Sequence, residues 1–108
     1  MFDVRHDSQH QPERLALVGS LTIYEVRQAH EALLGALVSS AETRHWLLDL
    51  SELEELDSAG AQLLLALQRH LAQQQARLEV TGPAGEVLGM LELLRLQPLY
   101  PDVLPAKA

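Results

Sequence analysis

The stretch from Trp46 to Leu71 constrains the fold more than any other part of the chain. It opens with a short apolar run that ends at Leu50, continues through an acidic connector, and enters a long helical pattern at residues 57–60. A short apolar run between polar residues is typical of a strand buried on both faces, and the change to a period of 3.6 residues marks a helix. A strand followed so closely by a helix favours an α/β fold.

Alternating short strands and amphipathic helices are predicted along the rest of the chain. Strands are expected at 2–6, 14–18, 46–50 and 77–81, the last of these being the final strand, and helices at about 24–39, from 58 onward, and at 84–94. Thr22 is the expected N-cap of the first helix, with Glu25 completing a capping box. The sequence therefore predicts a single α/β domain, residues 1–108, with a small mixed sheet and helices packed mainly on one face. Its core would cover about residues 2–99, with an irregular tail at 100–108.

The charge balance limits the classes of partner. The 108 residues include 15 Asp and Glu against 8 Lys and Arg, a formal net charge of −7. We therefore expect neither nucleic acid nor insertion into a membrane, because nucleic acids and anionic membrane surfaces require a basic footprint. The chain has no cysteine, which excludes disulfides and thiolate zinc sites and suits a reducing compartment. With no signal sequence and no apolar run long enough to span a bilayer, we expect a cytoplasmic protein.

No motif predicts catalysis, a metal or a cofactor. A hydrolase nucleophile elbow requires glycine two residues before the serine, and Leu56 occupies that position relative to Ser58. The five histidines lack metal-ligand spacing, and no P-loop motif is present. We therefore expect a protein without enzymatic activity, without a metal and without a cofactor.

Ser58 stands at the start of the Leu-rich helix and allows two interpretations. Either Asp57 or Ser58 caps the helix, or the Ser58 hydroxyl is phosphorylated there. A phosphate would add about 1.5 to 2 negative charges, which the helix N-terminus attracts and Asp57 and Glu55 repel. We therefore expect little change in fold and a large change in the surface that a partner meets. Gly60 likewise allows two interpretations, close approach by a partner or tight packing of the helix on the sheet.

Acidic residues are concentrated just before this helix. Between Arg44 and Arg69 there is no Lys or Arg, whereas this interval contains Asp49, Glu52, Glu54, Glu55 and Asp57. This acidic run is either a solvated loop or an electrostatic docking edge that steers a cationic partner.

Together these segments resemble a STAS domain, the family of bacterial anti-sigma factor antagonists. The similarity covers about Phe2 to Leu99, and its most specific parts are the L-D-L-S sequence at 48–51 and D-S-A-G at 57–60, the start of a helix. In such proteins the serine of a D-S-[ST]-G motif is phosphorylated by a partner serine kinase that is also the anti-sigma factor. The resemblance implies that Ser58 is the phosphoacceptor. Ala59 stands where many antagonists have serine or threonine.

The resemblance predicts a regulatory binding domain that docks a serine kinase or anti-sigma factor and is switched by phosphorylation of Ser58. The alternative is a STAS subunit of a chemotaxis-associated complex, which residues 21–25 resemble, or of a phospholipid-transport ABC complex, which residues 101–105 resemble. Such a subunit would bind its signalling partner or transport ATPase without obligatory phosphorylation. A third, weaker class is a ligand-binding module. The expected partner-binding residues are Glu54, Glu55, Asp57, Ser58, Ala59, Gly60, Gln62 and Leu65. Leu65 is included because it falls off the predicted apolar stripe and is expected to be exposed.

Overall fold

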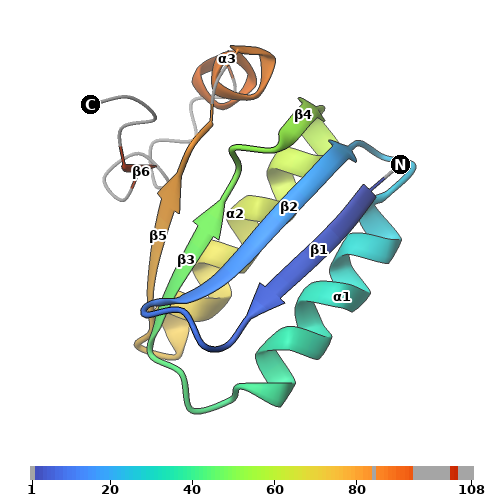
Figure 1. The fold of residues 1–108 in the computed structure, drawn as a ribbon. Coiled ribbons are helices and arrows are strands. Elements are labelled where there is room, and N and C mark those ends of the chain that lie inside the picture. The colour runs from blue at the N-terminus through green and yellow to red at the C-terminus, as the bar shows by residue number, and fades with distance from the viewer. Residues whose placement is uncertain (1, 84, 94–102, 105–108) are drawn as a thin grey trace.

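In the part of the chain that the structure describes, a mixed sheet is packed with three helices (Figure 1). The computed structural model describes residues 2–83, 85–93 and 103–104. The strands are β1 (Phe2–Asp7), β2 (Glu13–Leu21), β3 (His45–Asp49), β4 (Leu53–Leu56), β5 (Arg77–Thr81) and β6 (Val103–Leu104). The helices are α1 (Val26–Ser39), α2 (Ser58–Gln73) and α3 (Gly85–Leu93).

The sheet has the order β1-β2-β3-β5-β6, with β4 also paired to β2. Edge strand β1 is antiparallel to β2, and all the other pairs are parallel. The prediction of a small mixed sheet is confirmed. The prediction that residues 77–81 form the final strand is wrong, because β6 pairs with β5 beyond α3. The remainder of the predicted tail, at 100–102 and 105–108, lies outside the described residues, as do the ends of the helix predicted at 84–94.

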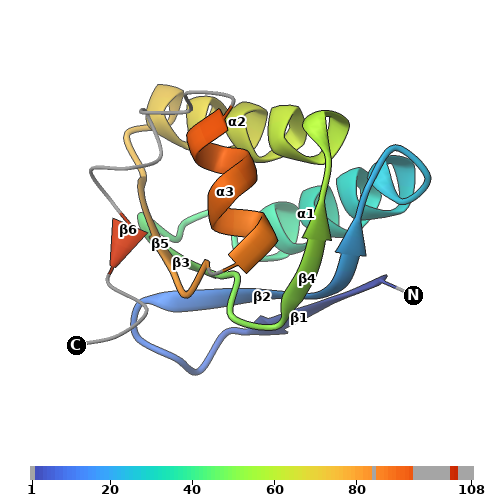
Figure 2. The same cartoon turned by 90° about the horizontal axis from the view of Figure 1, so that it is seen from above.

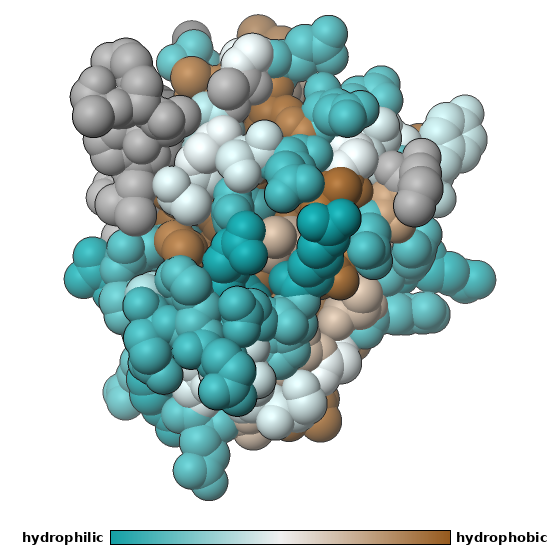
Figure 3. All heavy atoms as spheres, in the orientation of Figure 1, coloured by the Kyte–Doolittle hydropathy of each residue, from teal (hydrophilic) through white to brown (hydrophobic). Residues whose placement is uncertain are grey.

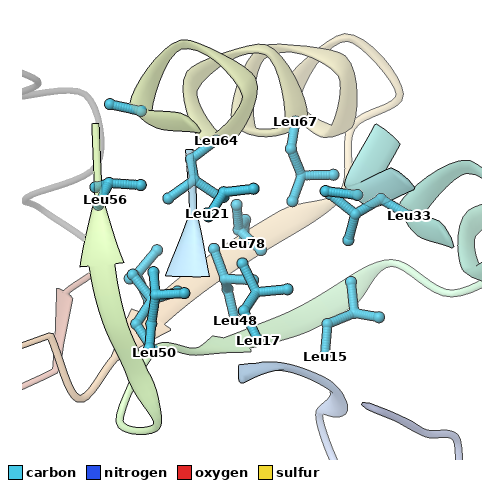
Figure 4. Close-up of a cluster of buried hydrophobic side chains, with 14 of the residues drawn as sticks. Leu15, Leu17, Leu21, Leu33, Leu48, Leu50, Leu56, Leu64, Leu67 and Leu78 are labelled. Carbon is cyan, nitrogen blue, oxygen red and sulfur yellow. The ribbon is translucent and has the colours of Figure 1, made fainter. Parts of the chain in front are cut away.

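Helices α1 and α2 cover one face of the sheet, and α3 lies across the end of the sheet beside β4 (Figure 2). Because paired residues of neighbouring strands share a face, Leu15, Leu48 and Val80 project together toward the helices. Figure 4 shows the leucines of β2, β3 and α2 meeting between the two layers. These side chains form the hydrophobic core, as predicted for helices packed mainly on one face.

The opposite face of the sheet is covered by no described helix and is largely hydrophilic (Figures 1 and 3). Its residues alternate with those of the core, and on it the Arg14 guanidinium donates to the Asp49 carboxylate at 2.6 Å. Leu47 and Asp49 are partly exposed here. The expectation that residues 46–50 are buried on both faces is therefore wrong, because the described helices α1 and α2 cover the same single face of the sheet.

The acidic connector contains a strand that sequence analysis did not predict. β3 pairs with Glu13–Ala16 of β2, and β4 pairs with Gly19–Leu21 farther along the same edge, with an irregular register between Gly19 and Ser20. Leu53 and Leu56 are buried, whereas the two glutamates between them are exposed. The two buried residues are three positions apart, whereas a regular strand alternates with a period of two. The sequence pattern therefore did not predict this strand.

Helix α1 begins later than predicted. Its first residue is Val26, and Thr22 is not its N-cap. Instead, Glu25 Oε1 accepts hydrogen bonds from the Thr22 backbone N–H at 2.8 Å and from the Thr22 hydroxyl at 2.6 Å. Half of the expected capping box thus forms, but it closes a turn between β2 and α1 rather than capping the helix.

Candidate functional site

Asp57 is the N-cap of α2. Its backbone is extended, and Oδ1 accepts a hydrogen bond of 2.9 Å from the backbone N–H of Gly60. This bond satisfies one of the N–H groups that a helix leaves unpaired at its start. Of the two capping interpretations, the structure therefore selects Asp57, and α2 does not need the Ser58 hydroxyl as its cap.

The second oxygen of Asp57 joins the start of α2 to the turn between β2 and α1. Oδ2 accepts a hydrogen bond of 2.9 Å from the Ile23 backbone N–H, and the Asp57 backbone N–H donates to the Leu21 carbonyl at 3.3 Å. Burial alone would raise the pKa of the Asp57 carboxyl, but the hydrogen bonds from the N–H groups of Gly60 and Ile23 hold that pKa below its ordinary value. The carboxylate therefore stays charged and holds two distant segments together.

Ser58 is the first residue of α2 and is exposed. Its hydroxyl makes no hydrogen bond to any residue that the structure describes. The helix N-terminus beside it favours negative charge. This hydroxyl is therefore accessible, and a reaction there would break no hydrogen bond within the described structure.

Gly60 is buried against the backbone of β2. A Cβ atom at this position would lie 2.3 Å from the Leu21 carbonyl oxygen and 2.9 Å from side-chain carbons of Leu21 and Leu56. Any side chain would collide there, so the interpretation of Gly60 as a position of tight helix–sheet packing is confirmed. The burial of Gly60 also argues against its predicted contact with a partner.

The expectation that Leu65 is exposed is wrong. Its side chain is only 7% exposed and belongs to the hydrophobic core. Helix α2 packs against the sheet on one side and also contacts α3, so its buried surface is wider than a single stripe. The other predicted positions differ in exposure: Ala59 and Asp57 are half-buried, and Gln62 and Glu55 are exposed.

The acidic run does not form one continuous edge. Asp49 is bound to Arg14 on the helix-free face, and Glu52 lies 3.7 Å from the guanidinium of Arg5. Glu54 is exposed, and together with Arg5 it lines a shallow hollow on the same face. The acidic groups left beside Ser58 in the sequence are Glu55 and Asp57, and Asp57 is already engaged as the cap.

Two exposed apolar residues near Ser58, Ile23 and Tyr24, were not predicted to belong to the site. Ile23 is 67% exposed and Tyr24 is 90% exposed, and the Ile23 backbone is held to Asp57. The signal in the sequence was the pair Thr22 and Glu25, which was assigned to a helix cap, whereas its hydrogen bonds close a turn that contains both residues. The exposed hydroxyl at the start of α2 thus lies near two exposed apolar residues of the turn between β2 and α1.

Within the described residues, no group of three or more His, Asp or Glu side chains is arranged to hold a metal ion. None of the described helices combines the length and hydropathy that a membrane crossing requires. The candidate site thus consists of the exposed Ser58 hydroxyl, the capping carboxylate of Asp57 and the exposed side chains of Ile23 and Tyr24.

Several solved structures share this fold. The anti-sigma factor antagonist SpoIIAA in its unphosphorylated form is 19% identical, with a TM-score of 0.73 over 99% of this chain and 89% of that chain. The Bacillus cell fate determinant SpoIIAA in the phosphorylated form is also 19% identical, with a TM-score of 0.68 over 99% and 92% of the two chains. An anti-sigma factor antagonist from Mycobacterium paratuberculosis is 17% identical, with a TM-score of 0.77 over 90% and 80%.

The similarity extends to a transport protein. A sulfate transporter family protein from Wolinella succinogenes is 17% identical, with a TM-score of 0.70 over 86% of this chain and 75% of that chain. No curated protein matches the sequence. The family model described as Mlab, STAS domain matches residues 4–101, nearly the whole chain. The resemblance drawn from the L-D-L-S and D-S-A-G sequences is therefore confirmed, and the chain belongs to this STAS domain family.

Proposed function

We propose that the protein is a cytoplasmic regulatory domain of the anti-sigma factor antagonist type, without enzymatic activity of its own. It docks a serine kinase or anti-sigma factor through the start of α2, and phosphorylation of Ser58 switches this docking. The proposal depends on the different roles of Asp57 and Ser58 at the start of α2. Asp57 caps α2, which leaves the Ser58 hydroxyl exposed and unbonded within the described structure.

The electrostatics at the helix start support a switch that acts on docking rather than on folding. A phosphate on Ser58 would be attracted by the N-terminal dipole of α2 and repelled by the charged carboxylate of Asp57. These opposing effects leave the fold nearly unchanged. The same phosphate adds about two negative charges to the surface that a partner meets.

The docking surface is defined by the exposed residues around that hydroxyl. Ile23 and Tyr24 supply apolar area, and the exposed Gln62 lies one turn along α2 from Ser58. Interfaces are commonly anchored by such aromatic side chains, surrounded by polar residues that exclude water. The similarity in fold to anti-sigma factor antagonists, including SpoIIAA in a phosphorylated form, supports the same interpretation.

The proposal is tested with purified serine kinases of the source organism, beginning with those encoded near this gene. Each kinase is incubated with the protein and ATP, and the products are weighed by intact-mass spectrometry. We expect a gain of one phosphate that is lost in Ser58→Ala and retained in the control Ser8→Ala, since Ser8 is also exposed. Kinase affinity should fall after phosphorylation. If no kinase adds phosphate to Ser58, the switch is refuted.

A second function is favoured by two observations. The matching family is described as Mlab, and the fold is shared with a sulfate transporter family protein. On this alternative the protein is a subunit of a transport or chemotaxis-associated assembly, and its docking at α2 needs no phosphate. Tight binding to a transport ATPase that is equal for wild type and Ser58→Ala would support this alternative.

A further inference from the structure

The outer surface of the helix layer contains an apolar groove that the proposed docking at Ser58 does not use. It runs between α1 and α2 and is lined by His30, Leu33, Leu34, Leu37, Leu63, Ala66, Leu67 and His70, with a volume of about 240 Å³. We refer to it as the α1–α2 groove. On each helix its lining residues span eight positions, 30–37 and 63–70, which at 1.5 Å per residue is about 10 Å of helix length. The groove is therefore long enough to contact two turns of another helix.

The ridge beside the groove is also apolar. Leu34 is 44% exposed, and Val38, one turn farther along α1, is 74% exposed. Single exposed apolar residues are ordinary, but here they continue an apolar groove on the same helix. Ala66 on α2 is exposed as well, and its small side chain leaves the groove open.

The charges of the helix layer differ in sign from those of the whole protein. The chain has a net charge of −7, yet α2 contains no Asp or Glu, and Glu31 is the single acidic residue of α1. Arg27 and Arg69 are exposed on these helices, and neither forms an ion pair with any residue that the structure describes. Arg27 stands one turn before His30 and two turns before Leu34, and Arg69 is next to His70. The α1–α2 groove thus lies in a mildly basic area of an acidic protein.

We propose that the α1–α2 groove binds an amphipathic helix of a protein partner, with an apolar stripe that enters the groove and acidic residues on its flanks. An α-helix fits because helices pack side by side at about 8–10 Å with their side chains interdigitated, and grooves between helices receive partner helices in this way. Acidic flanks fit because Arg27 and Arg69 have no ion-pair partner within the described structure.

Two other occupants fit the charges less well. If a second copy of this chain met the groove with its own groove, the interface would bring Arg27 and Arg69 close to the same basic residues, which is repulsive. An anionic membrane would be attracted by the arginines, but recognition of such membranes uses clusters of about four to eight basic residues. The net charge of −7 opposes membrane binding further.

The probe is a fluorescein-labelled synthetic helix of about 18 residues, with leucines at i, i+3, i+4 and i+7 spacing and glutamates on both flanks. Its counterpart has lysine in place of every glutamate. Binding is measured by fluorescence anisotropy and located by the amide shifts of the ¹⁵N-labelled protein. We expect the acidic peptide to bind at least about tenfold more tightly than the basic one, and to shift the amides that line the α1–α2 groove.

Matched variants identify the groove as the binding site. Ala66→Glu places a carboxylate in the groove, and Leu34→Gln removes apolar area from its α1 side, so each should weaken binding of the acidic peptide by about tenfold or more. The control is Ala72→Glu, because Ala72 is exposed on the same helix and does not line the groove. Both alanine variants should show the circular dichroism spectrum of the wild type, and Leu34→Gln is the test that remains if Ala66→Glu does not fold.

Several results would overturn the proposal. Equal affinity for both peptides would show binding by apolar contact alone. Amide shifts confined to other surfaces, or no binding at about 1 mM peptide, would show that the α1–α2 groove does not bind a helix of this kind. Sedimentation showing a dimer that Ala66→Glu dissociates would assign the groove to a second copy, and binding to phosphatidylglycerol vesicles that Ala66→Glu abolishes would assign it to a lipid surface. None of these outcomes depends on phosphorylation of Ser58.

Discussion

Two glycines in helices should respond in opposite directions to the same substitution. In α2, a Cβ atom on Gly60 would lie 2.3 Å from the Leu21 carbonyl oxygen, and in α1 a Cβ atom on Gly35 would meet nothing within 4 Å. The chemical change, glycine to alanine, is identical at the two positions. Effects of opposite sign on the free energy of unfolding would therefore report the surroundings of each glycine rather than the helix propensity of the residue.

The magnitudes follow from these distances. Alanine is favoured over glycine in a helix interior by about 1 kcal/mol, so Gly35→Ala should stabilise the protein by about 0.5–1 kcal/mol. At Gly60 the Cβ atom must move away from a backbone atom by about 1 Å to reach ordinary contact, and overpacking of this kind costs about 1–3 kcal/mol. Because this cost exceeds the gain in helix propensity at the first turn, we expect Gly60→Ala to be destabilising by about 1–2 kcal/mol.

Urea unfolding at pH 7, followed by far-ultraviolet circular dichroism, measures both variants against the wild type. The two midpoints should move in opposite directions with an unchanged dependence on urea concentration. In a thermal scan each kcal/mol corresponds to a shift in Tm of about 4–8 °C for a domain near this size. The packing explanation would be refuted if Gly60→Ala were as stable as the wild type, or if both variants moved the same way.

Three further predictions concern stability. Asp57→Ala should lower the free energy of unfolding, measured in urea titrations, by about 0.5–2 kcal/mol because α2 loses its cap. Asp57→Asn should cost less, because asparagine also caps helices. A loss of similar size in Ser58→Ala would contradict the assignment of Asp57 as the cap. Leu65→Ala should cost about 2–5 kcal/mol, as for a buried leucine, and a cost near zero would mean that the side chain is exposed after all. Burial alone would raise the pKa of the Glu13 and Asp49 carboxyls, but hydrogen bonds hold the pKa of both below its ordinary value, as at Asp57. The bonds to Glu13 come from Ser40, Thr43 and His6, and those to Asp49 come from Ser51 and Arg14. A carboxyl whose pKa is lowered in the folded state stabilises the fold at pH values above its unfolded pKa. The urea midpoint should therefore fall as the pH drops from about 5 through and below about 4. A midpoint that stays constant over this range would exclude these interactions as a source of stability.

Most strands of the core and helix α2 could be predicted from the sequence, because the signals for them lie within each segment. β2, β3, β5 and α2 lie close to their predicted positions, since each has a clear period or, for β3, a short apolar run between polar residues. The D-S-A-G sequence also predicted the start of α2 correctly, because an aspartate before a helical pattern is a strong capping signal. The same few residues were sufficient to identify the family.

The errors have tertiary causes. β4 was missed because its register with β2 is irregular, so Leu53 and Leu56 are both buried although they are three residues apart. Leu65 was placed outside because the pattern of α2 alone does not show that this helix contacts α3 as well as the sheet, which widens its buried surface. Ile23 and Tyr24 were assigned to a helix start, and their exposure depends on the turn closed by Glu25 and on the carboxylate of a residue far along the chain.

The buried indole of Trp46 provides an optical reporter of the folded core. It is the one tryptophan of the chain, it is 1% exposed, and the centre of its ring system lies 5.7 Å from that of His6. β3 starts near Trp46 and runs toward the end of the sheet where α2 begins (Figure 1). Intrinsic emission should therefore redden when the protein unfolds, yet stay constant when another molecule covers Ser58 at the far end of the strands. Folding and docking can thus be read separately in the same cuvette without any introduced dye.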